Sequence, residues 1–248
     1  MRCWPETSLD VLHTVELGFA ATLCGSVLHC WAFPEGAPVK DANDRIAAVW
    51  ALVQAGYTKL HTTERLSNLT VKMFCSGGVR RPWADAPTLK AHAGEIRHLV
   101  PVLALVATQR AGDSTAAAHM AAALQNLATL NMVCDSQDMF MTAESAEKAF
   151  TSMKRSLQHY AWLHINFQDT QRFPIRPKFH FCYHIAYFAR YQNPRTSWCY
   201  KNEDWVGRLA RIAHSCSHGT GGVKVSASLH QKYLVMLHLR LTNAITEM

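Results

Sequence analysis

A long apolar tract from Val11 to Phe33 restricts the folds open to this sequence. The tract is long enough to cross a bilayer, but it contains His13, Glu16 and His29. A membrane would penalise the acid by a few kcal/mol. Apolar residues recur along the tract at intervals of three or four, which is typical of one face of a helix. We therefore expect a helix of a protein core, and no membrane span.

The composition of the 248-residue chain is that of a globular protein, with 49% hydrophobic and 17% charged residues. A net charge of +7 favours a polyanionic partner. The eight cysteines are irregularly spaced and form no C-x-x-C pair, so reduced thiols are expected. The first ten residues lack the pattern of a signal peptide. These features predict a nuclear or cytoplasmic protein.

Helical periodicity dominates the chain and predicts a mainly α fold, a helical bundle. Beyond the first tract, helices are predicted over 42–54, 63–74, 89–109, 116–132, 142–167, 179–191, 202–213 and 226–245. Gly56 is expected to end the helix that precedes it, and Pro101 is expected to kink or split its helix. Loops are predicted at 33–39, 76–87 and 173–178 from their Gly and Pro content. The only short strand candidates are 198–200 and 223–225.

Three separate stretches carry recognisable patterns. The first, 9–18, reads LDVLHTVELG, and the second, 89–97, reads LKAHAGEIR. The third combines PKFH at 177–180, His184, and WCYKNEDWVGRL at 198–209. In this order they resemble the D-x-M/L-H-x-x-x-x-G, L-K-A-x-E-W-R, P-K-x-H-x-x-x-H and F-E-x-x-x-G-x-L segments of En/Spm-type (CACTA) DDE/D DNA transposases. The second stretch departs from that pattern by an extra Gly94 and a missing Trp.

The resemblance implies a remnant of a ribonuclease-H-like core with a large helical insertion. Residues 1–33 would correspond to the region of the second catalytic carboxylate, 34–172 to the insertion, and 173–248 to the last catalytic helix and the C-terminal helices. In an intact relative, carboxylates hold two Mg²⁺ ions at the phosphodiester. The resemblance assigns this role to Asp10 and Glu203, with His13 as support.

The same resemblance places the first catalytic Asp and the core sheet upstream of Met1. The chain would then be the C-terminal part of a transposase, and DNA cleavage by this chain alone is not expected. An upstream transposase segment or a second copy of the chain would be its protein partner.

Each candidate site residue also has a structural interpretation. Asp10 is a suitable helix N-cap, and Glu203 falls in the first turn of a predicted helix, where the macrodipole favours acids. His180 and His184 lie one helical turn apart, a spacing that can bind Zn²⁺ or place two imidazoles against a core. His13 can likewise be a half-buried core residue.

Basic residues gather around the third stretch, with aromatic residues between them, which suits binding to the DNA backbone and stacking on bases. The residues expected to contact DNA are Arg176, Lys178, Arg195, Lys201, Arg208 and Arg211. The alternative is a solvated helix surface. The sequence thus predicts a fragment or degenerate form of a DNA transposase that binds transposon ends, and the competing prediction is a non-enzymatic α-helical interaction protein. Carboxylates of Asp10 and Glu203 about 4–8 Å apart would favour the transposase.

Overall fold

The structure, a computed structural model, describes residues 9–199 and, beyond them, 210–211, 214, 227–228, 230–235 and 238. The chain divides into two compact units, Met1–Trp198 and Cys199–Met248. Helices dominate the described residues, and none of these residues forms a strand, which confirms the mainly α class. The strand prediction at 198–200 is wrong for Trp198 and Cys199, and the one at 223–225 lies outside the described residues.

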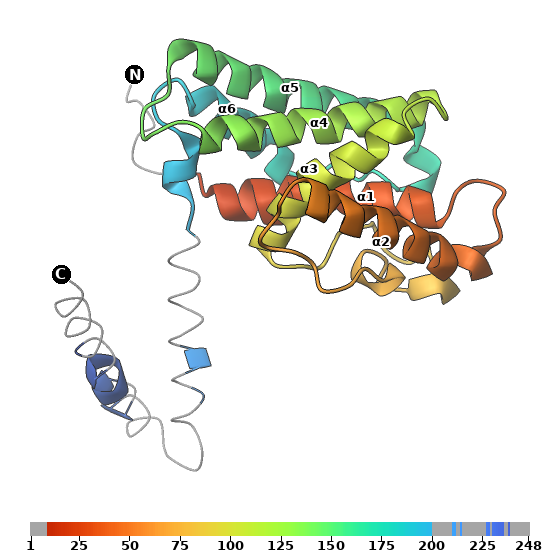
Figure 1. Ribbon diagram of the computed structural model, residues 1–248, viewed down its shortest axis with the longest axis horizontal. Helices are drawn as coiled ribbons and strands as arrows, with labels where there is room; N and C mark the ends of the chain where they lie inside the picture. Colours follow the sequence, from red (N-terminus) through yellow and green to blue (C-terminus); the bar gives the residue numbers. More distant parts are fainter. Residues whose placement is uncertain are drawn as a thin grey trace. The chain divides into compact units, whose positions relative to one another are not determined.

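The apolar tract forms one continuous helix with two geometries. Residues Leu12–Ala20 are a π-helix, η1, which runs directly into α1, Ala21–Ala32 (Figure 1). Within the described residues, Leu12–Ala32 is the helix long and apolar enough to cross a membrane, and 89% of its most apolar window is buried inside the protein. This burial is what we expect of a core helix.

Between residues 9 and 199, five further α-helices pack around this central helix. Their bounds are Ala42–Lys59 for α2, Ala93–Gln109 for α3, Thr115–Asp135 for α4, Ala143–Asn166 for α5 and Lys178–Phe188 for α6. Short 3₁₀ turns occupy Val39–Asp41, Val71–Met73, Gly78–Arg80, Gln168–Thr170 and Pro194–Ser197. Helices α4 and α5 lie side by side, α3 packs on α4, and α6 packs on α5 and η1 (Figure 1).

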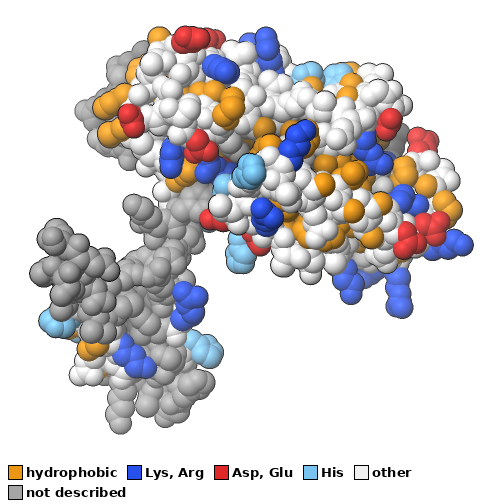
Figure 2. Space-filling view, viewed as in Figure 1, with side chains coloured by type: hydrophobic (Ala, Val, Ile, Leu, Met, Phe, Trp, Pro, Cys, Tyr) orange, Lys and Arg blue, Asp and Glu red, His pale blue; other side chains and the backbone are white. Residues whose placement is uncertain are grey.

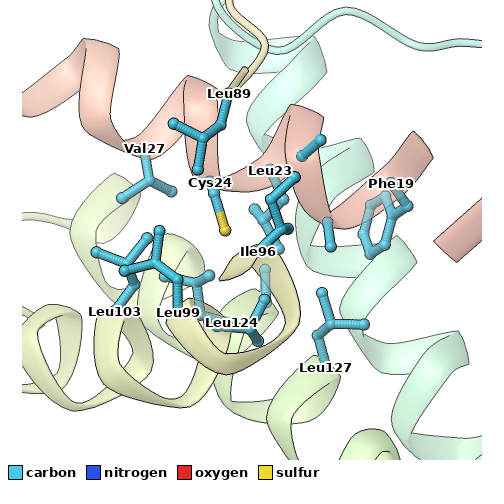
Figure 3. Close-up of a cluster of buried hydrophobic side chains, with 14 of the residues drawn as sticks. Phe19, Leu23, Cys24, Val27, Leu89, Ile96, Leu99, Leu103, Leu124 and Leu127 are labelled. Atoms are coloured by element: carbon cyan, nitrogen blue, oxygen red, sulfur yellow. The ribbon is translucent and has the colours of Figure 1, made fainter. Parts of the chain in front are cut away.

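Aliphatic side chains from the central helix, α3 and α4 form the core (Figure 3). Leu23 faces Ile96 of α3 and Leu124 of α4, and all three are fully buried. Tyr160 of α5 joins this core to α6, because its ring contacts Phe19 and Phe179 at centroid distances of 5.5 and 5.1 Å. The Tyr160 hydroxyl also donates a hydrogen bond to the Pro174 carbonyl at 2.9 Å. The tyrosine thus fills the core without leaving its polar atom unpaired.

Local signals set the ends of α4 and α5 close to the predicted positions. The Ser114 hydroxyl accepts a hydrogen bond from the Ala117 N–H, and Thr142 accepts one from Ser145. Helix α3 begins at Ala93, later than predicted, with a capping box formed by His92 and Glu95.

The prediction of a helix over 63–74 is wrong. This segment is a loop whose only helical turn is Val71–Met73. Leu66, Leu69 and Phe74 are nevertheless buried. The apolar spacing that suggested a helix belongs to a loop that inserts single side chains into the core.

Gly56 and Pro101 also behave differently from the prediction. Gly56 lies inside α2, where a Cβ atom would come within 2.7 Å of Cγ1 of Val102. The glycine therefore allows α2 to approach α3 closely, and does not end the helix. Helix α3 continues through Pro101 without a break.

Gly25 brings the backbone of the 88–89 loop directly against α1. The Leu89 N–H donates to the Ala21 carbonyl at 2.9 Å, and a Cβ atom on Gly25 would lie 2.6 Å from the Leu89 nitrogen. Since backbone atoms cannot yield as a flexible side chain can, we expect Gly25→Ala to lower the free energy of unfolding by about 1–3 kcal/mol in urea denaturation. Gly112→Ala is the control, because nothing lies within 4 Å of a Cβ there. Equal stability of the two variants would contradict the close packing.

Candidate functional site

Asp10 caps the first helix and contacts an imidazole. Its carboxylate accepts hydrogen bonds from the N–H groups of Leu12 at 3.0 Å and His13 at 3.3 Å. The same carboxylate contacts Nδ1 of the His13 ring. Both side chains are partly exposed, by 32% for Asp10 and 45% for His13. The capping interpretation of Asp10 is confirmed, and the carboxylate remains accessible from solvent.

The described parts of the three stretches that resemble transposase segments meet at η1. From the third stretch, the Lys178 ammonium donates to the His13 carbonyl at 3.4 Å, and the Cys182 thiol donates to the Thr14 carbonyl at 3.5 Å. From the second, Nε of Arg97 lies 3.8 Å from Oε1 of Glu16. Segments far apart in the chain therefore surround one turn of the π-helix.

Glu16 is the most unusual ionisable group at this junction. The residue is only 1% exposed, and neither carboxylate oxygen has a hydrogen-bond partner among the described residues. Burial raises the pKa of the Glu16 carboxyl to about 8, although the Arg97 charge lowers it and Asp135 raises it further. Both π-helical turns and ionisable groups with a shifted pKa are frequent at functional sites.

Arg97 links Glu16 to a second acid. Its guanidinium donates to Asp135 at 2.5 Å and lies 4.0 Å from the centroid of the Trp198 ring. Arg195 approaches the same carboxylate at 3.8 Å. Glu16 is conspicuous in the sequence as an acid in an apolar tract, but no local pattern identifies Arg97 as its partner.

The buried cysteines do not form a nucleophilic site. Cys24, Cys30, Cys75, Cys134 and Cys182 are all free thiols. Burial raises the pKa of each, to about 11 for Cys30 and about 12 for Cys134. These thiols stay protonated at neutral pH and are therefore poor nucleophiles.

The His180 and His184 side chains meet on α6, as their spacing predicts. Their Nε2 atoms lie 2.8 Å apart, a hydrogen-bond distance at which one ring donates to the other. Zn²⁺ would replace that proton and needs further ligands. Among the described residues, no third His, Cys, Asp or Glu joins this pair in a cluster. The zinc site stays a prediction.

The structure describes some of the residues expected to contact DNA. Arg176 and Lys178 are exposed before and at the start of α6, and Arg176 donates to the Thr88 hydroxyl at 2.8 Å. Arg195 is half-exposed beside Asp135, and Arg211 is an exposed helical residue of the second unit. On the face in Figure 2, Lys and Arg side chains are scattered among hydrophobic ones and form no continuous basic surface over the described residues.

Glu203, Lys201 and Arg208 lie outside the described residues, as does most of the helix predicted over 202–213. The separation of the Asp10 and Glu203 carboxylates is therefore not part of the geometry described. Comparisons with known proteins found no matching family model, no matching curated protein and no matching solved structure.

The buried Glu16 makes stability depend on pH. In the unfolded chain the carboxyl ionises near its ordinary pKa of 4.5, whereas the folded protein retains the proton until about pH 8. Raising the pH from 5 to 8 should therefore lower the free energy of unfolding, by about 3–5 kcal/mol from this group. Glu16→Gln removes this ionisation, and urea denaturation should show a much flatter profile for the variant over this range.

A suitable control is Glu35→Gln, which changes an exposed acid in the 33–39 loop. This variant should retain the pH profile of the unmodified protein. If Glu16→Gln also retains that profile, the Glu16 carboxyl is already ionised in the folded protein at neutral pH.

Proposed function

We propose that this protein descends from the C-terminal part of a CACTA-type DDE/D transposase and binds DNA. The observation that supports the proposal is the convergence at η1 of the described parts of the three resembling stretches, through Arg97, Lys178 and Cys182. If the stretches form a shared site, they must come together in the fold. In a helical bundle without catalytic ancestry, nothing requires these particular stretches to be in contact.

The chemistry at the junction agrees with this proposal. Asp10 offers a partly exposed carboxylate, and His13 contacts it. Lys178 adds an exposed cation at the same turn, and Arg176, two residues earlier in the chain, adds a second exposed cation, which suits neutralisation of a phosphate backbone. In an intact relative, Asp10 and Glu203 would hold Mg²⁺ for strand cleavage and transfer. In this chain, DNA binding without cleavage is the proposed activity, in a nuclear or cytoplasmic protein.

A non-enzymatic interaction protein is the second candidate. The exposed aromatic side chains on and after α6, Phe181, Tyr183, Phe188 and Tyr191, favour it. Such a protein would bind a partner chain through apolar contacts, with little dependence on salt, whereas DNA binding weakens steeply as salt rises.

DNA binding by the full chain can be measured by fluorescence anisotropy with a labelled duplex over a range of salt concentrations. We expect the logarithm of the affinity to fall linearly with the logarithm of salt. The double variant Arg176→Glu/Lys178→Glu should bind about tenfold or more weakly and show a shallower salt slope, because two phosphate contacts are replaced by repulsion.

The matched control is Lys59→Glu/Lys148→Glu, which changes the same total charge at exposed positions of α2 and α5, outside the resembling stretches. This control should retain most of the affinity. No binding of the unmodified protein at low salt would refute the proposed function, and equal weakening by both double variants would remove the role of Arg176 and Lys178.

A further inference from the structure

A pocket on the opposite end of the central helix from Asp10 has no role in the function proposed above. It has a volume of about 380 Å³, within the range of small-ligand sites. His29 of α1, Trp83 and Asp85 of the 76–87 loop, and Thr170 and Gln171 after α5 line it. Three segments far apart in the chain thus form one concave site.

Trp83 offers an aromatic surface in this pocket. The residue remains 50% exposed, although the His29 ring packs against it at a centroid distance of 4.9 Å. The guanidinium of Arg172 lies 4.8 Å from the Trp83 ring centroid and 5.7 Å from that of Phe167. These contacts fix the indole, and a fixed, half-exposed indole is a platform on which a flat ligand can stack.

Asp85 supplies the hydrogen-bond acceptor of this pocket, and His29 supplies a neutral ring. His29 is 1% exposed, and its Nε2–H donates to the Pro82 carbonyl at 2.8 Å. Its Nδ1 is buried as well and has no hydrogen-bond partner among the described residues. Burial lowers the pKa of His29 to about 4, which keeps the ring neutral. The Asp85 carboxylate, which accepts a hydrogen bond from the Ser76 hydroxyl, is exposed and offers two acceptor oxygens to a ligand.

Arg172 adds a buried positive charge beside the pocket. It is 8% exposed and forms no ion pair with the described residues, and its Nε has no hydrogen-bond partner among them. A buried cation that no described residue pairs attracts negative charge, so an anionic ligand is favoured here. The ligand that suits these groups is flat, bears N–H donors on one edge, and carries a negative charge.

We propose that this pocket binds a nucleotide, with its base stacked on Trp83, its amino and imino groups donating to the two carboxylate oxygens of Asp85, and its phosphate attracted by Arg172. Guanine fits best, because its N1–H and N2–H₂ donors lie side by side on one edge, whereas thymine offers a single imino donor. The nucleotide can be free or an unpaired residue of a DNA strand. The proposal does not depend on DNA binding through Arg176 and Lys178.

The test is calorimetric titration of the full chain with each of the four deoxynucleoside monophosphates and with deoxyguanosine. We expect saturable binding, strongest for dGMP, and weaker binding of deoxyguanosine, which lacks the phosphate. Trp83→Ala should weaken dGMP binding about tenfold, and Trp83→Phe, which keeps a flat ring, should weaken it much less. Asp85→Asn should weaken dGMP binding more than dTMP binding.

Tyr191→Ala is the control variant, because Tyr191 is another exposed aromatic residue, 63% exposed, and does not line the pocket. This variant should bind dGMP normally. The denaturation midpoint of each variant shows whether it folds, and Asp85→Asn at its exposed position tests the pocket even if Trp83→Ala does not fold.

Titration with a guanine-containing single strand and with its duplex identifies the source of the nucleotide. If the single strand binds and Trp83→Ala weakens that binding, the ligand is an unpaired nucleotide of DNA. If only mononucleotides bind, the ligand is a free nucleotide. The proposal is overturned if no mononucleotide or single strand binds saturably up to about 1 mM, the limit of weak specific binding. It is also overturned if Trp83→Ala and Asp85→Asn both fold and bind dGMP normally.

Discussion

The burial of the Leu12–Ala32 helix is the constraint on which the rest of the bundle depends. Helices α2, α3, α4 and α6 pack on it, and α5 reaches it through the contact between Tyr160 and Phe19. Glu16 lies within this helix, and Arg97 of α3 covers its buried carboxyl, while Asp135 accepts a hydrogen bond from Arg97. One apolar helix and one buried acid thus lie at the centre of the contacts that meet at η1.

Much of the fold follows from local patterns. The amphipathic spacing over 142–167 and the Ala- and Leu-rich run over 116–132 match α5 and α4, since Thr142 and Ser114 mark where those helices begin. The wrong predictions occur where contacts between residues far apart in the chain determine the local structure. Gly56 permits close packing against Val102, and the 63–74 segment buries its apolar residues one by one from a loop. Neither feature leaves a trace in nearby sequence.

The candidate sites show the same division. The capping role of Asp10 and the meeting of His180 with His184 depend on residues within one helical turn, so spacing alone predicts them. The Glu16–Arg97 pair and the pocket at Trp83 depend on tertiary packing between segments far apart in the chain. No periodicity encodes such pairs, and the sequence around an isolated Glu or Trp does not indicate which distant residues it contacts.

The π-helical geometry of η1 also fixes a rotational relation within the central helix. In this geometry the Ala21 N–H bonds to the carbonyl of Glu16, five residues back, whereas an α-helix bonds four back. A residue of a π-helix advances the azimuth by less than the about 100° of an α-helical residue, so rewinding Leu12–Ala20 into α-helix would turn its start relative to α1. Asp10 and His13 would then face another sector while Leu23 stayed in the core. The wide turns of η1 therefore set the rotation between the start of the helix, where Asp10 and His13 face solvent, and the buried face of α1.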